Sequence, residues 1–179
     1  MHENDEAIEA WNTVLFDKFQ RFRPLLDVGL GRHGTHALEL ISPTEGMHAV
    51  DLGCGFGETS FDIARRVGPT GSCVGVDAAS RFVDSAAVEA KAIAAENVRF
   101  ECHDVANDSL GGPYDYAFSR FGMMFFASPV AALRNVRASL KPGATFVSVV
   151  WRKKVDNDFL HAAEVEVEDL SRRPPKRTK

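Results

Sequence analysis

The stretch Val50-Asp51-Leu52-Gly53-Cys54-Gly55-Phe56-Gly57 places three glycines at alternate positions directly after an apolar run. Residues Met47 to Leu52 have the composition of a short buried strand, and Glu58 to Val67 show the helical spacing of apolar residues. Glycine permits a sharp turn between the two elements and leaves backbone N–H groups open to a ligand, because no Cβ shields them. The stretch therefore predicts a strand, a glycine turn and a helix that together form a cradle for a ligand.

The spacing of the glycines limits which ligand the turn can hold. A dinucleotide fingerprint, Gly-x-Gly-x-x-Gly, would need its third glycine at position 58, where the chain has Glu58. A carboxylate beside a pyrophosphate would also add like-charge repulsion. The spacing thus disfavours an NAD-binding oxidoreductase, while an ordinary tight turn without a ligand stays an alternative.

An acidic residue followed by Gly-x-Gly-x-Gly resembles motif I of the class I S-adenosylmethionine-dependent methyltransferases. In that family the turn holds the methionine part of the cofactor. The resemblance implies an α/β fold, with a Rossmann-like, open and mainly parallel sheet flanked by helices, and S-adenosyl-L-methionine as cofactor.

A second acidic residue follows the next predicted strand. Residues Ser72 to Val76 form an apolar run that ends at Asp77, and a helix is predicted from Ser80 to Glu96. Asp77 lies 20 residues beyond Gly57, where a parallel nucleotide-binding sheet places an acid that accepts hydrogen bonds from ribose hydroxyls. Gly75-Val76-Asp77 also resembles the acidic-loop motif that binds the ribose of S-adenosylmethionine. A turn carboxylate is the alternative.

Two further matches follow the third and fourth predicted strands, Asn97 to Cys102 and Tyr114 to Ser119. The resemblance assigns Asp104 to the adenine amino group, and it places Ser-Arg-Phe-Gly at 119–122 beside the cofactor and the acceptor pocket. Core packing of the aromatic and methionine residues near 121–126 is the alternative. The cofactor-binding positions that the resemblance implies are Asp51, Gly53, Cys54, Gly55, Gly57, Thr59, Asp77, Ala78, Asp104, Val105, Ser119 and Arg120.

The chain divides into three predicted regions. Residues 1–42 form an N-terminal helical lid or cap, with one helix from Ile8 to Phe22 that Pro24 ends and a second over Thr35 to Ile41. Residues 43–170 form the S-adenosylmethionine-binding domain. Residues 171–179 form a basic, disordered tail.

The end of the sequence departs from the resembled family. A helix over Pro129 to Leu140 and a fifth strand over Ala144 to Trp151 lead into a charged helix from Asn157 to Leu170. The sixth and seventh strands of a full class I fold have no residues left to form them. Either the sequence is an incomplete version of a longer protein, or a partner such as a second copy covers the bare edge of the fifth strand.

Composition and charge set outer limits on the protein. A length of 179 residues with 45% hydrophobic content suits one globular domain. The N-terminus lacks an apolar signal region, and no run of about 18 apolar residues occurs, so we expect a soluble cytoplasmic protein with no membrane partner. Cys54, Cys73 and Cys102 are far apart, which predicts reduced, mostly buried thiols and no metal site.

The formal charge of −4 hides an asymmetry between the body and the tail. Without the five basic residues of the last eight positions, 16 basic and 25 acidic side chains remain, a charge of −9. An acidic body argues against a nucleic-acid groove, although the basic tail could make weak, salt-sensitive contacts.

The matches from about residue 47 to 151 imply methyl transfer to a small-molecule acceptor. A sulfonium is already a good electrophile, so the protein would mainly align the reactants and exclude water. This fits a sequence with no evident nucleophile, triad or metal cluster, and the catalytic residues are unknown. His33, His36 or Tyr114 could deprotonate an acceptor, but nothing singles one out. A cofactor-binding protein without turnover and a purely structural truncated isoform are the remaining alternatives.

Overall fold

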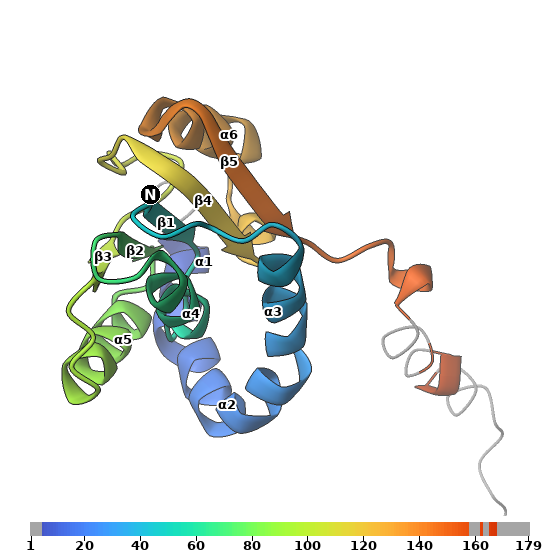
Figure 1. The fold of residues 1–179 in the computed structure, drawn as a ribbon. Coiled ribbons are helices and arrows are strands. Elements are labelled where there is room, and N and C mark those ends of the chain that lie inside the picture. The colour runs from blue at the N-terminus through green and yellow to red at the C-terminus, as the bar shows by residue number, and fades with distance from the viewer. Residues whose placement is uncertain (1–4, 158–161, 163–164, 168–179) are drawn as a thin grey trace, which may run out of the picture. The chain divides into compact units, whose positions relative to one another are not determined.

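A five-stranded parallel sheet with the strand order β3-β2-β1-β4-β5 forms the centre of the computed structural model, which describes residues 5–157, 162 and 165–167. From β1 the chain runs outward to β2 and β3, and it then returns to the other side of β1 for β4 and β5 (Figure 1). This topology confirms the predicted α/β class with a Rossmann-like sheet. The strands are β1 (His48–Leu52), β2 (Ser72–Asp77), β3 (Val98–Cys102), β4 (Tyr114–Arg120) and β5 (Leu140–Val149).

The central strands β1, β2 and β4 are apolar along most of their length, as expected for strands that are covered on both faces. β1 and β2 pair so that Leu52 lies opposite Val76, which brings the carboxyl ends of these strands level. β4 pairs with the other side of β1. Because the strand order reverses between β1 and β4, the crevice at their carboxyl ends is the place where open α/β sheets bind ligands.

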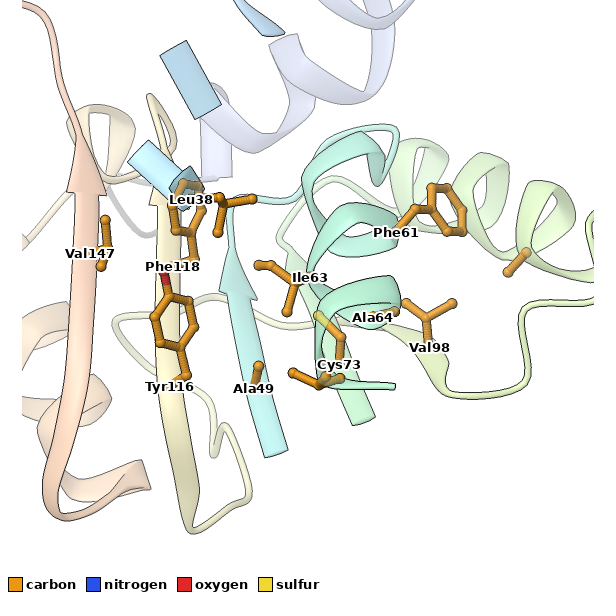
Figure 2. Packing of buried hydrophobic residues seen from close by; sticks show 12 residues of the cluster. Leu38, Ala49, Phe61, Ile63, Ala64, Cys73, Val98, Tyr116, Phe118 and Val147 are labelled. Carbon is orange, nitrogen blue, oxygen red and sulfur yellow. The ribbon is translucent and has the colours of Figure 1, made fainter. Parts of the chain in front are cut away.

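Helices cover both faces of this sheet. They are α3 (Gly31–Leu40), α4 (Glu58–Val67), α5 (Ser80–Ala92) and α6 (Pro129–Ser139). On one face Ile63 of α4 packs in a cluster with Tyr116 and Phe118 of β4, as Figure 2 shows. On the other face Val50 of β1 belongs to a cluster with Val136 of α6. Burial of each such side chain contributes about 1.5–3 kcal/mol, so the two clusters hold the strand ends firmly in place.

The N-terminal segment consists of α1 (Asp5–Ala10), a π-helical turn η1 (Trp11–Leu15) and α2 (Phe16–Gly29). The prediction that Pro24 ends the helix is wrong, because α2 continues through Pro24 to its end. Proline removes a backbone donor inside a helix. Ion pairs of the neighbouring Arg23 hold α2 against the domain at this point, and they oppose that loss.

The second helix also begins earlier than predicted, at Gly31 instead of Thr35. Glycine has low helix propensity, so Gly31 and Gly34 hide this first turn from a sequence pattern. A Cβ at Gly34 would lie 2.9 Å from Cδ of Arg120. The small residue therefore makes room for the arginine side chain.

Several element boundaries differ in the second half of the unit, and the largest differences are at the end of α5 and the start of β5. α5 ends at Ala92 and not at Glu96. β5 begins at Leu140, whereas the sequence predicts a helix through that residue and a strand from Ala144. The β4–β5 register shifts at this place, so Lys141-Pro142-Gly143 is a bulge inside the strand, where an edge strand tolerates proline.

Residues from Val150 onward form a second unit. It contains a 3₁₀ turn, η3 (Lys154–Asp156), and residues 162 and 165–167 are helical. Most of the predicted helix from Asn157 to Leu170, and the whole predicted tail 171–179, lie outside the described residues.

No helix within the described ranges is both long and apolar enough to cross a membrane. All three cysteines are free thiols: Cys54 and Cys73 are buried as predicted, whereas Cys102 is exposed.

Candidate functional site

The glycine turn joins β1 to α4 as predicted. Gly57 has a φ of +87°, and a Cβ added there would lie 2.7 Å from Cζ of Phe100, so the turn requires glycine at this position. At Gly55 an added Cβ would meet only Phe82 Cδ1, at 4.0 Å, so the position where a side chain of residue 55 would project is open. The backbone N–H groups of Gly53 and Cys54 donate to the carbonyl of Val76, which ties the turn to the end of β2.

Asp77 lies beside this turn, at the end of β2, where the sequence places it. Its Oδ2 accepts a hydrogen bond from the Gly55 N–H at 2.9 Å, and its Oδ1 accepts one from the Ala79 N–H at 3.0 Å. Burial raises the pKa of this carboxyl, and the backbone donors oppose that rise. These bonds give Asp77 a structural role in the turn. Each carboxylate oxygen also has a second lone pair for a ligand hydroxyl.

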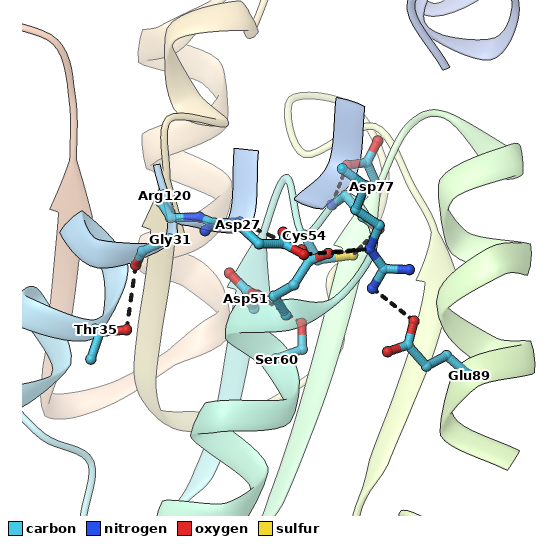
Figure 3. A network of polar contacts seen from close by, with 12 residues as sticks. Asp27, Gly31, Thr35, Asp51, Cys54, Ser60, Asp77, Glu89 and Arg120 are labelled. Carbon is cyan, nitrogen blue, oxygen red and sulfur yellow. Dashed lines mark hydrogen bonds and ion pairs between the residues drawn. The ribbon is translucent and has the colours of Figure 1, made fainter. Parts of the chain in front are cut away.

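Asp51 lies behind the turn and is only 1% exposed. Ser60 Oγ donates to Asp51 Oδ2 at 2.7 Å, which joins β1 to the first turn of α4. Burial raises the pKa of Asp51 to about 6, although the Ser60 hydrogen bond and the charge of Arg120 lower it. Figure 3 shows how Asp51, Ser60 and Asp77 gather near the ends of β1 and β2. A direct contact between Asp51 and a cofactor stays a prediction.

The loop after β3 reaches the same edge of the sheet, because the His103 N–H donates to the backbone carbonyl of Asp77 at 3.1 Å. Within the loop, Asp104 accepts hydrogen bonds from the Ala106 N–H and from the Asn107 amide, at 2.9 and 2.8 Å. Val105 is buried in the core cluster beneath. Asp104 thus shapes its own loop, and its predicted contact with adenine stays a prediction.

The end of β4 completes the site. Ser119 Oγ donates to the carbonyl of Leu52 at 2.8 Å and accepts from the Met123 N–H at 3.2 Å. A Cβ at Gly53 would lie 2.8 Å from Gly122 Cα, so the backbone of the β4 loop packs directly on the glycine turn. Arg120 follows Ser119 and lies 3.5 Å from Glu58 of α4.

An ion-pair network that the sequence did not predict holds the N-terminal helix to this site. Arg23 of α2 donates through Nε to Glu58 at 2.8 Å and through Nη2 to Glu89 of α5 at 2.7 Å. Its guanidinium also lies 4.8 Å from the ring centroid of Phe56 in the turn. No local pattern announces these partners, since they lie 35 and 66 residues from Arg23 along the chain.

Aromatic side chains form a second link between the N-terminal segment and the turn. Phe56 of the turn and Phe16 of α2 both contact the ring of Phe82 of α5, at centroid distances of 4.7 and 4.9 Å. Trp11 contacts Phe125 beyond β4 at 5.1 Å. The segment 11–19 therefore packs on both the turn and the β4 loop.

A cavity of about 580 Å³ lies next to the turn, between the end of α2, α3, the start of α4 and Arg120. Of the predicted cofactor-binding positions, only Thr59 and Arg120 line it. His36 also lines it and lies 3.8 Å from Glu39. The predicted positions in the turn, at Asp77 and at Asp104 do not line this cavity.

The candidate bases lie in different parts of the structure. Tyr114 is the first residue of β4, so it lies at the opposite edge of the sheet from the turn, and its hydroxyl donates to the Leu110 carbonyl at 2.7 Å. The suggestion that Tyr114 serves as the base is therefore wrong. His33 lies near the site, where its ring packs 5.8 Å from that of Phe121.

The five-stranded parallel sheet, with a glycine turn after β1 and an acid after β2, defines the class of this protein as an α/β protein with a Rossmann-like fold. A family model described as a methyltransferase domain matches residues 43–172, and the chain belongs to this family.

Curated relatives of the chain include methyltransferases, and solved structures share its fold. The chain is 28% identical over 150 residues to a demethylmenaquinone methyltransferase of Lactococcus lactis, covering 82% of this chain and 59% of the relative. It is 33% identical over 102 residues to nocamycin O-methyltransferase of Saccharothrix syringae, covering 56% and 36%. A SAM-dependent methyltransferase structure from Aquifex aeolicus matches with a TM-score of 0.62 at 19% identity, covering 73% of this chain and 77% of that one. The chain thus spans less than two thirds of either curated relative.

Proposed function

We propose that this protein binds S-adenosyl-L-methionine and transfers its methyl group to a small-molecule acceptor. The observation that carries the proposal is the hydrogen bond between Asp77 and the Gly55 N–H, which joins the acid and the glycine turn in a chain of the methyltransferase domain family. An acid at this place in a parallel sheet accepts hydrogen bonds from ribose hydroxyls.

The residues at this edge fit such a cofactor. The position where a side chain of residue 55 would project is open, and Asp77 is partly exposed with unused lone pairs. The turn would hold the methionine part, Asp77 and Ala78 the ribose, and Asp104 and Val105 the base. Ser119 and Arg120 would border the reacting end, next to Thr59. S-adenosylmethionine has no pyrophosphate, so the carboxylate of Glu58 would not repel it as it would repel NAD.

The bound cofactor supplies an electrophilic methyl group on a sulfonium. The residues of the chain contribute alignment and exclusion of water. Trp11 and Phe16, which pack on Phe82, would shield the site, so we propose residues 1–42 as a lid over a cofactor-binding domain that begins at residue 43. His33 and His36 remain candidate bases for an acceptor that needs deprotonation.

The acceptor is proposed to be a small molecule because the names of these two relatives, one of which matches 82% of this chain, specify small molecules. The cytoplasmic location, the absence of a nucleic-acid or membrane partner and self-association stay predictions from the sequence. A second candidate function is cofactor binding without turnover. It is favoured because the chain spans only 59% of the demethylmenaquinone methyltransferase. Segments that bind the acceptor can lie in the part of that relative that this chain does not match.

Calorimetry with S-adenosylmethionine, S-adenosylhomocysteine and NAD in parallel tests the proposal. We expect saturable binding of the first two and none of NAD. Binding of NAD alone would overturn the proposal. Binding of S-adenosylhomocysteine without methylation of any offered acceptor would favour the second candidate function.

A further inference from the structure

The cavity beside the glycine turn contains an arginine whose hydrogen-bonding capacity is unused. The Arg120 side chain is 17% exposed and lines the cavity. Within the described part of the chain its guanidinium has one ion-pair partner, Glu58, at 3.5 Å, and no hydrogen-bond acceptor. A distance of 3.5 Å is longer than an N–H···O hydrogen bond, and guanidinium carries five N–H donors. A largely buried guanidinium in this state is suited to bind an anion.

Glu58 does not neutralise Arg120 fully, because Arg23 already binds it. Arg23 Nε donates to Glu58 Oε1 at 2.8 Å, whereas Arg120 lies near the other oxygen only at ion-pair distance. The remaining carboxylates of the cavity wall also have basic partners. Asp62 lies 3.5 Å from both Arg65 and Arg66. Asp27 lies 4.0 Å from Arg23, and Glu39, whose side chain is 63% exposed, lies 3.8 Å from His36, which is an ion pair only when the imidazole is protonated.

The fold makes room for Arg120 to reach the cavity. It leaves the end of β4 and passes along α3, where Gly34 and Gly31 face it; added Cβ atoms would lie 2.9 and 3.7 Å from its side chain. Figure 3 shows Arg120 beside Gly31, the first residue of α3. Thr59 lines the same cavity two residues after Gly57, so the cavity adjoins the glycine turn. Its volume of about 580 Å³ lies within the usual range for small-molecule pockets, roughly 300–1,000 Å³.

We propose that this cavity is the acceptor pocket and that it takes an organic carboxylate, whose two oxygens pair with the forked donors of Arg120. Arg120 is then a specificity-determining residue that selects an anionic acceptor. This inference rests on the proposed methyltransferase function, although the anion site itself can be tested without turnover.

The test uses ligand-observed NMR titrations of the wild-type chain with three matched pairs: benzoate and benzamide, 2-naphthoate and 2-naphthamide, hexanoate and hexanamide. Each pair differs in charge and hardly in size. We expect at least one carboxylate to bind with a dissociation constant on the order of 1 mM, and its amide to bind about tenfold more weakly. Equal binding within every pair, or no carboxylate binding up to about 50 mM, would overturn the inference.

Variants locate the site. Arg120→Gln should weaken carboxylate binding about tenfold and Arg120→Lys by a smaller factor, since lysine keeps the charge but loses the fork. The control Arg137→Gln removes the charge of an exposed arginine on α6 that does not line the cavity, and it should change binding less than about twofold. If Arg120→Gln does not fold, the titrations of Arg120→Lys and the comparison of carboxylate with amide on the wild-type chain still test the inference. A loss no larger than that of the control would overturn the assignment of Arg120.

Titrations with S-adenosylhomocysteine separate the two proposals. If that compound binds and no carboxylate binds, the inference fails alone. If carboxylates bind through Arg120 and S-adenosylhomocysteine does not bind, the anion site stands and the methyltransferase proposal fails.

Discussion

Replacing Arg23 by glutamine should lower the free energy of unfolding by about 1.5–3 kcal/mol. Arg23 makes charge-assisted hydrogen bonds to Glu58 at 2.8 Å and to Glu89 at 2.7 Å, and a cation–π contact with Phe56 at 4.8 Å. The side chains of the two ion pairs are 25–37% exposed, so solvent weakens both. About 0.5–1 kcal/mol for each of the three contacts gives the stated range.

Urea denaturation followed by circular dichroism measures this loss. Arg21→Gln is the control, since Arg21 is an exposed residue of the same helix that lies 5.4 Å from the Phe22 ring. It should change stability by less than about 0.5 kcal/mol. A double-mutant cycle with Glu89→Gln should give a coupling energy of about 0.5–1 kcal/mol. Equal stabilities of the Arg23 and Arg21 variants would refute the idea that this network holds α2 on the domain.

Two further outcomes test the glycine turn and the buried acid. Gly57→Ala should lower the free energy of unfolding by about 2–4 kcal/mol, because it combines a positive φ with a 2.7 Å contact to Phe100. Gly143→Ala, with a φ of +80° and open space around the new Cβ, should lower it by only about 1 kcal/mol. Equal losses for the two variants in thermal unfolding would contradict the packing argument. The pKa of Asp51 rises on folding to about 6 from an ordinary value near 4, so the folded state binds the extra proton and stability falls as pH rises between these values. Asp51→Asn, which can still accept from Ser60, should therefore gain stability relative to wild type by on the order of 3 kcal/mol across that window, and a pH-independent difference would contradict it.

Local signals predicted the centre of the fold well. The helix Glu58–Val67 was predicted with its observed bounds, because a glycine turn precedes it and Gly68 follows it. The position of Asp77 beside the turn also followed from the sequence, since parallel pairing of β1 with β2 brings their carboxyl ends together.

Long-range contacts explain what the sequence could not show. Pro24 breaks a helical pattern, yet α2 continues through it, and Arg23 anchors the helix through partners far away in the chain. The cavity depends on α3 lying beside the start of α4, and only Gly34 hints at the close approach of Arg120. Such pairings are decided by tertiary packing, which no local pattern encodes.

Binding of S-adenosylhomocysteine to the Asp77→Asn protein tests the central claim most directly. Asp84→Asn, an exposed change on α5, is the matched control, and circular dichroism shows that both variants are folded. The account predicts that Asp77→Asn loses about 2–4 kcal/mol of binding free energy, the range for charge-assisted hydrogen bonds to two hydroxyls, while the control keeps wild-type affinity. Equal affinity of folded Asp77→Asn and wild type would contradict it.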